Sequence, residues 1–161
     1  MKSDIFESNP PPVTVQRARK VRDDSGQWWL EKRAGPQAEW AEQRQRLRNH
    51  HLITAGLDLP GVARPQALEK DGDVLVLRLP WLAGTDLAQT GPGHGAQPPD
   101  PTLAQHITLG AARLLAALEA QGIAHGAICA EHVLWDPASQ TAALLDFGLA
   151  RYVRCVAITG A

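Results

Sequence analysis

The side chain best placed to do chemistry in this sequence is the carboxylate of Asp146, which follows Leu144-Leu145 and precedes Phe147-Gly148. A carboxylate that follows a buried strand points toward a cleft, and its oxygens suit a hard divalent cation. The plainer alternative is a turn aspartate that caps the backbone of Gly148. The pattern therefore predicts a metal-binding carboxylate, with a capping turn as the competing interpretation.

A second group of reactive side chains lies in residues 125–134, which read HGAICAEHVL. The chain has 6 histidines, which could suggest a metal cluster. However, His50 and His51 are adjacent and point in different directions on a helix, and no pair has the i, i+4 spacing of helical ligands. We therefore expect solvated or hydrogen-bonded histidines; the others are His94, His106, His125 and His132.

The composition bounds the class of protein. The chain has 161 residues, 44% of them hydrophobic and 20% charged, so it can form one packed domain or two small lobes of one. Its net charge of −1 argues against broad nucleic-acid binding. No apolar run reaches membrane-spanning length and the N-terminus lacks a secretory signal, so we expect a cytoplasmic protein. Cys129 and Cys155 have no metal-like spacing and are not expected to form a disulfide.

Local patterns in the first part predict mostly strands. Residues 13–21 and 27–30 read as strands around the turn at 23–26, and Gly35-Pro36 is expected to open a helix that ends near Gly56. Residues 62–68 and 74–77 then read as a hairpin about Asp71-Gly72. The basic run at 17–22 is expected to be a solvated strand face rather than a phosphate or lipid site.

The Pro/Gly-rich stretch 91–101 divides the chain into residues 1–90, this linker, and residues 102–161. After it, Asp100-Pro101 predicts a helix start and Gly122 a helix end. Two short strands follow at 133–135 and 142–145. The elements that must position Asp146 are therefore one helix and a strand pair.

This order, together with residues 125–134 and the segment 144–151, resembles the protein-kinase-like superfamily over about residues 5–152. The resemblance implies an α+β fold: a small antiparallel N-lobe, five-stranded with one helix, a hinge, and a truncated, mainly helical C-lobe. Two branches of this superfamily resemble the sequence. His125-Gly126 and His132 look like bacterial lipopolysaccharide-core sugar kinases of the Kdo/heptose type, toward which we lean slightly. Asp146-Phe147-Gly148 reads like a serine/threonine kinase.

The resemblance implies ATP and Mg²⁺ as cofactors. Asp146 would bind the metal, Lys32 the phosphates, and Leu77 to Leu79 the edge of the adenine. A solvated lysine at the end of a strand is the alternative for Lys32. His125 would have a structural role beside Phe147. Most of the tryptophans are expected in the core, with Trp81 the exception because it follows the hinge.

Three positions depart from the family pattern. The catalytic aspartate position holds Ala127, which cannot orient an acceptor hydroxyl. The second metal ligand, normally asparagine, is His132, although Mg²⁺ prefers oxygen. The expected glycine-rich loop at 7–15 has prolines at 10–12 and no glycine. The glutamate partner of Lys32 is also unclear: counting along the helix reaches His50, Gln45 or Glu42, the last favoured as a surface residue.

The chain ends 15 residues after Asp146, so the resemblance implies a fragment, a degenerate product, or a domain that a protein partner completes. The leading hypothesis is an ATP-dependent phosphotransferase acting on a sugar or protein acceptor, weakly active or inactive. The alternatives are a non-catalytic pseudokinase that binds or scaffolds, and a truncated gene product. No nucleic-acid partner and no transmembrane segment are expected.

Overall fold

The computed structural model describes residues 17–89 and 101–153. In its first part the elements are β1 (Arg17–Arg22), β2 (Trp28–Ala34), the 3-10 turn η1 (Ala38–Trp40), α1 (Ala41–Thr54), β3 (Ala67–Asp71), β4 (Val74–Pro80) and β5 (Thr85–Asp86). In its second part they are α2 (Pro101–Ala120), β6 (Ile123–Ala124), η3 (Ala130–His132), β7 (Val133–Asp136), β8 (Thr141–Leu144), η4 (Phe147–Leu149) and β9 (Arg151–Tyr152).

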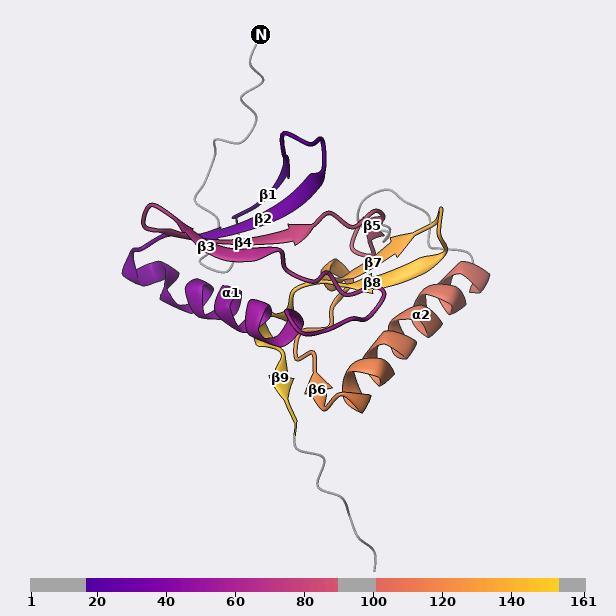
Figure 1. Ribbon diagram of the computed structural model, residues 1–161. Helices are drawn as coiled ribbons and strands as arrows, with labels where there is room; N and C mark the ends of the chain where they lie inside the picture. Colours follow the sequence, from indigo (N-terminus) through magenta and orange to yellow (C-terminus); the bar gives the residue numbers. More distant parts are fainter. Residues whose placement is uncertain (1–16, 90–100, 154–161) are drawn as a thin grey trace, which may run out of the picture.

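The described residues form an α+β fold whose sheets pair their strands antiparallel, as the sequence predicts at this level. Four strands pair in the order β1-β2-β4-β3, and α1 lies across one face of that sheet (Figure 1). A three-stranded sheet, β5-β7-β8, packs beside α2, and β6 pairs with β9. No helix among the described residues has the length and apolar character needed to cross a bilayer.

Strand β2 places two charged side chains on opposite faces of the four-stranded sheet. Successive side chains of a strand alternate between faces, so Leu30 and Lys32 face one way and Glu31 the other. Both charged residues are buried, with 7% of Lys32 and 3% of Glu31 exposed. Each therefore needs partners of opposite charge within the fold.

Two hydrophobic clusters hold the elements together. One packs Leu47 of α1 against the sheet, with Leu75, Leu77 and Leu79 of β4. The other packs the end of α1 and one side of α2 onto the three-stranded sheet around Phe147, which is 1% exposed. Because α1 contributes to both clusters, it fixes the four-stranded sheet relative to the segment that carries Asp146.

The first helix begins later than the sequence predicts. Gln37 is extended, with φ −62° and ψ 159°, so Gly35-Pro36 does not open the helix and α1 starts at Ala41. The guanidinium of Arg44 donates to the carbonyls of Gly35 and Gln37, and the Gln37 carbonyl also accepts from the Trp40 amide in the 3-10 turn that precedes α1. The helix ends at Thr54, close to the predicted stop.

The hairpin around Asp71-Gly72 is present, but its first strand starts at Ala67 rather than at residue 62. Val62 instead bridges Leu144 of the other sheet, and Gly61, with φ +86°, accepts a hydrogen bond from the Leu144 amide. The two-residue strands β5, β6 and β9 were not predicted, because two residues are too few to show a period.

Some predicted segments lie partly or wholly outside the described residues. The described N-terminal sheet has four strands rather than the five that the resemblance implies, and residues 13–16 and the loop at 7–15 lie outside the described ranges. Pro101 is the first residue of α2, so the predicted linker 91–101 overlaps the helix; its residues 91–100 also lie outside those ranges. Strands β7 and β8 match their predicted positions within one residue.

Candidate functional site

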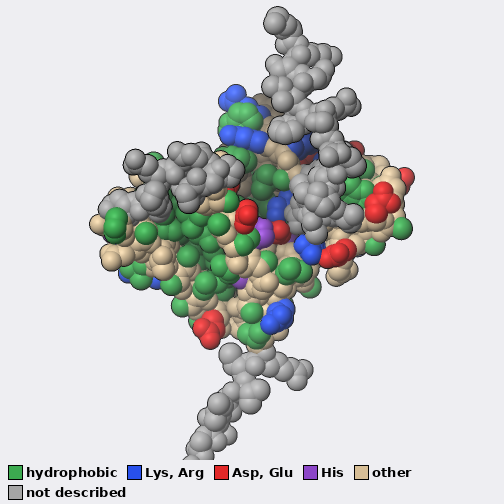
Figure 2. All heavy atoms as spheres, turned by 180° about the vertical axis from the view of Figure 1, so that it is seen from behind, with side chains coloured by type: hydrophobic (Ala, Val, Ile, Leu, Met, Phe, Trp, Pro, Cys, Tyr) green, Lys and Arg blue, Asp and Glu red, His purple; other side chains and the backbone are tan. Residues whose placement is uncertain are grey.

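A cavity of about 770 Å³ opens between the four-stranded sheet and the sheet β5-β7-β8. Figure 2 shows histidine, acidic and basic side chains meeting near the middle of one face, beside a recess with hydrophobic side chains. The apolar lining comes mainly from both sheets and the chain after β4, and includes Leu30, Ala63, Leu79, Trp81, Leu82 and Leu134. The ionisable lining consists of Lys32, His50, Asp86, Glu131, His132 and Asp146.

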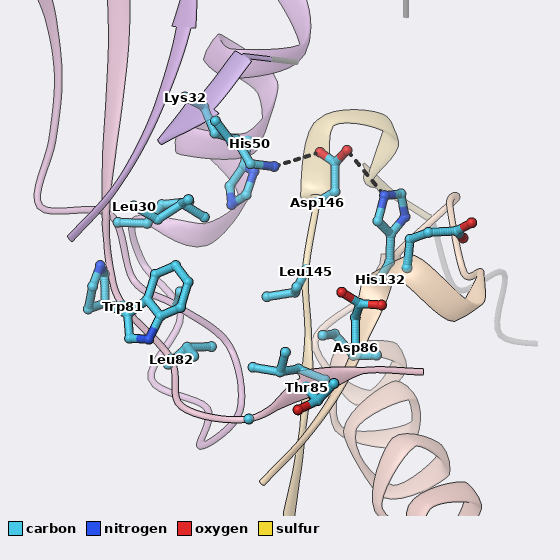
Figure 3. Close-up of a pocket in the computed structure, with 18 of the residues that line it drawn as sticks. Leu30, Lys32, His50, Trp81, Leu82, Thr85, Asp86, His132, Leu145 and Asp146 are labelled. Atoms are coloured by element: carbon cyan, nitrogen blue, oxygen red, sulfur yellow. Dashed lines mark ion pairs between the residues drawn. The ribbon is translucent and has the colours of Figure 1, made fainter. Parts of the chain in front are cut away.

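Lys32 and Asp146 form an ion pair at the inner end of this cavity. The Lys32 Nζ lies 3.3 Å from Asp146 Oδ1, and 9% and 17% of the two side chains are exposed (Figure 3). Burial lowers the pKa of Lys32, although the Asp146 charge opposes it. Burial would raise the pKa of Asp146, but the Lys32 and His132 charges outweigh it and the pKa is lowered. The pair therefore presents an ionised carboxylate to the cavity.

Asp146 adopts a left-handed backbone conformation, with φ 58° and ψ 74°. Such a conformation is uncommon for a residue other than glycine and persists where the surroundings enforce it. Its side chain also accepts a hydrogen bond from the amide of Gly148 at 3.3 Å. The capping turn and the cavity-facing carboxylate, two alternatives in the sequence, are thus properties of the same residue.

His125 holds the segment before Asp146 in place. Its Nε2 lies 2.9 Å from the carbonyl oxygen of Leu145, and its Nδ1 accepts from the amide of Ala127 at 3.3 Å. Because a carbonyl can only accept, Nε2 carries the proton and the ring is in one neutral tautomer. Burial lowers the pKa of His125, which favours this neutral ring. His125 also packs edge-on against Phe147, with ring centroids 4.5 Å apart.

His132 approaches Asp146 from the other side of the carboxylate. Its Nε2 lies 3.5 Å from Asp146 Oδ2, while its Nδ1 lies 2.7 Å from the carbonyl oxygen of Ala127 (Figure 3). The loop 125–134 thus orients the His132 ring through its own backbone. This contact, unlike the ion pair with Lys32, leaves Asp146 Oδ2 beside a nitrogen that can coordinate a metal.

His50 is the side chain of α1 that lines the cavity. It is 3% exposed, and its ring lies 5.7 Å from that of Phe147, between centroids. Burial, reinforced by the nearby charge of Lys32, lowers the pKa of His50 to about 3. His50 is one of the three helix positions at which the sequence places a partner for Lys32. Glu42, another of the three, is on the surface and pairs with Arg46. The carboxylate partner of Lys32 is therefore Asp146, not a glutamate of α1.

Asn49 ties α1 to the segment after Asp146. Its side-chain amide donates to the carbonyls of Gly148 at 3.1 Å and Ala150 at 2.7 Å. The helix comes so close here that a Cβ at Gly148 would meet Arg46 Cβ at 3.0 Å. Asn49 is not among the residues that the sequence predicts for the site, because nothing in the residues next to a polar helical side chain indicates its distant partners.

Two other candidates lie near the cavity without lining it. Leu77 is fully buried in the core and its side chain does not line the cavity, whereas Leu79 does line it. Ala127 does not line the cavity and contributes its backbone, as described for His125 and His132. Its neighbour Gly126 has φ +78°, a conformation that would strain an arginine at that position.

Trp81 lines the cavity and was the one tryptophan singled out for a ligand role. The amine of Lys20 lies 4.2 Å from a ring centroid of Trp81 and 4.5 Å from that of Trp28. In the same basic run, Arg19 hydrogen-bonds Glu31. Part of this run therefore makes contacts within the fold, and Lys20 braces the indole at the cavity edge.

No group of three or more metal-ligating side chains gathers within residues 17–89 and 101–153. Asp146 and His132 can thus supply two ligands at most, and an ion held there would need further ligands from water or a bound molecule. Cys129 is exposed and is a free cysteine, and Cys155 lies outside the described residues.

Comparisons with known proteins do not assign this chain to a family, so its function is argued from the geometry of the site. No model of a protein family matches the chain, and a search of curated proteins finds no match either.

Proposed function

We propose that this chain is a nucleotide-binding domain of protein-kinase-like fold that carries out phosphotransfer slowly or not at all. The observation that carries the proposal is the pairing of Lys32 with Asp146, 3.3 Å apart in a cavity of about 770 Å³. Protein kinases use a lysine on a strand to hold phosphates and an aspartate to hold the metal. Both kinds of group are present here, the lysine on β2 and the aspartate directly after β8 and Leu145.

The cavity also has the apolar part that a nucleobase needs. Leu30 and Leu79 come from the sheet, and Trp81 and Leu82 from the chain that leaves it. Ligand sites of this kind combine an apolar wall with a few polar groups at one end. The base would lie between these side chains and the phosphates would reach Lys32.

The bound cation would supply charge neutralisation for the phosphates. Asp146 would hold that cation through Oδ2, while Oδ1 stays with Lys32. His125 and Asn49 would keep Asp146 in its left-handed conformation, because they hold the backbone on both sides of it. Ala127 itself carries no carboxylate, so the acceptor hydroxyl would not be oriented from that position.

Titration with ATP and a divalent cation, followed by calorimetry and thermal shift, tests the proposal. We expect the wild type to bind ATP with a dissociation constant above about 1 μM. The Lys32→Met variant should not bind ATP. The matched control is Lys70→Met, which removes an exposed lysine of β3 and should leave binding unchanged. Equal loss in both variants, or no wild-type binding at millimolar ATP, would contradict nucleotide binding.

A second candidate is an active phosphotransferase with a sugar or protein acceptor. It is favoured by the carboxylates of Asp86 and Glu131, which line the same cavity and could orient an acceptor in place of Ala127. Transfer of radiolabelled phosphate to lipopolysaccharide-core sugars and to protein tests it. Turnover that Asp146→Ala abolishes would support this candidate, and turnover gained only in Ala127→Asp would support the first proposal.

A further inference from the structure

We infer that the cation site of this cavity selects a divalent first-row transition ion over Mg²⁺, because one of its two protein ligands is the imidazole of His132. The inference rests on the proposed function only for the phosphate oxygens that would complete the coordination. Its basis is the placement of His132 Nε2 and Asp146 Oδ2, which lie 3.5 Å apart (Figure 3).

The two donor atoms are close enough for one ion to contact both. Metal bonds to imidazole nitrogen and carboxylate oxygen are about 2.1 Å long, so one ion can bridge donors up to about 4.2 Å apart. The observed 3.5 Å lies within that reach. The other carboxylate oxygen, Oδ1, faces the Lys32 amine and is not needed.

The His132 ring has the orientation of a metal ligand. A ligating histidine commonly donates its other ring N–H to a carbonyl or carboxylate, which fixes the tautomer. Here Nδ1 lies 2.7 Å from the Ala127 carbonyl oxygen, which can only accept. Nδ1 therefore donates to that oxygen, which leaves Nε2, 3.5 Å from Asp146 Oδ2, as the ring nitrogen that would coordinate an ion.

This donor set does not suit Mg²⁺. Mg²⁺ prefers oxygen ligands and gives up its water reluctantly, whereas imidazole binds transition ions more strongly. An asparagine at this position would provide an oxygen ligand, whereas His132 provides its ring nitrogen Nε2, which lies beside Asp146. The site should therefore hold transition ions more tightly than Mg²⁺, with Mn²⁺ the weakest of that series.

Titration of the full chain with Mn²⁺, with Mg²⁺ as competitor, tests the inference through the electron paramagnetic resonance signal of free Mn²⁺. The wild type should prefer Mn²⁺ over Mg²⁺ by about 10-fold or more, and His132→Asn should remove most of that preference. His106→Asn is the matched control, since it makes the same change on an exposed position of α2. A preference for Mg²⁺ in the wild type, or an unchanged ratio in His132→Asn, would overturn the inference.

A spectroscopic readout keeps the test independent of whether the variant folds. Electron spin-echo modulation of bound Mn²⁺ should detect an imidazole nitrogen in the wild type and in His106→Asn. Its absence from wild-type protein, with or without ATP, would overturn the inference, as would failure to bind Mn²⁺ under both conditions. Nitrogen-coordinated Mn²⁺ without ATP binding would leave this inference standing and refute the nucleotide proposal; ATP binding with Mg²⁺ preferred would do the reverse.

Discussion

Glu31 and Asp146 are both acidic side chains with basic neighbours, but the fold treats them differently. Glu31 is 3% exposed, and Arg19 and Arg78 approach its two oxygens at 2.7 and 2.8 Å. Asp146 faces a cavity, and Lys32 and His132 approach it at 3.3 and 3.5 Å. The first arrangement, the Glu31 ladder, is a closed set of ion pairs that crosses strands β1, β2 and β4. The second arrangement borders the cavity and leaves room beside the carboxylate for a ligand.

The neighbours of the two carboxylates also differ in how they respond to pH. Burial alone would raise the pKa of Glu31, but hydrogen bonds from Arg78 and Arg19 outweigh it and lower the pKa. Arginine stays protonated at any pH at which proteins fold. The Asp146 region contains His50 and His125, whose pKa values are lowered by burial. The ladder should therefore resist mild acid, and the cavity region should not.

The largest expected effect is acid destabilisation through His50. Its pKa is lowered from 6.5 to about 3, so between these values the unfolded chain binds a proton that the folded chain excludes. The stabilisation is complete above pH 6.5 and is lost as the pH falls toward 3, by about 1.4 kcal/mol per unit, or on the order of 3 kcal/mol at pH 4. Urea unfolding at several pH values measures this slope.

In His50→Gln the slope should decrease by roughly one proton, while His125 still contributes. The control His106→Gln, on the surface of α2, should retain the wild-type slope. An unchanged slope in His50→Gln would show that another group causes the acid sensitivity.

Asp146→Asn should weaken Mn²⁺ binding at least about 100-fold, equivalent to about 2.7 kcal/mol, because loss of a direct ligand costs at least as much as loss of a supporting contact. Its thermal midpoint should fall less than that of Glu31→Gln, because burial already lowers the pKa of Lys32, which can lose its proton once Asp146 is neutral, whereas an arginine cannot. Calorimetry and thermal melting measure both quantities. Retained metal affinity would remove Asp146 from the site, and a large drop in stability would make it resemble Glu31.

Glu31→Gln should give the opposite result. It leaves Arg19, Arg33 and Arg78 without their shared carboxylate, and we expect a loss of about 2 kcal/mol in stability, reduced from the usual cost because these arginines are partly exposed. Metal and nucleotide affinity of the folded protein should stay near wild type. Glu42→Gln, which breaks an exposed pair with Arg46, should cost only about 0.4 kcal/mol. Equal losses in the two variants would contradict the buried ladder.

The smallest effect concerns the attachment of α1 to the Asp146 segment. Asn49→Ala removes the amide that donates to Gly148 and Ala150, and should lower stability by about 1 kcal/mol. Because Asp146 would then lose one of its backbone supports, Mn²⁺ affinity should fall as well. Arg48→Ala, one residue away on α1, is the comparison. A loss of stability in Asn49→Ala with unchanged affinity would make Asn49 structural only.

The sequence by itself determined the features that depend on neighbouring residues. The turn at Asp71-Gly72, the helix that starts at Pro101 and stops before Gly122, and the strands leading to Asp146 all follow from signals a few residues long. Asp146 was also marked by its neighbours, whereas the α+β class and the candidate role of Lys32 came from the resemblance of longer segments to the protein-kinase-like superfamily.

Only the tertiary structure decided which side chains meet. That Lys32 pairs with Asp146, that His50 rather than Glu42 faces the cavity, and that Leu77 lies in the core depend on helix position and strand register. His50 lies three residues from both Leu47 and Ile53, on the buried face of α1, and this helical spacing is a signal that could have marked it. Local propensities act over a few residues, whereas these contacts join segments far apart in the chain, and packing alone brings them together.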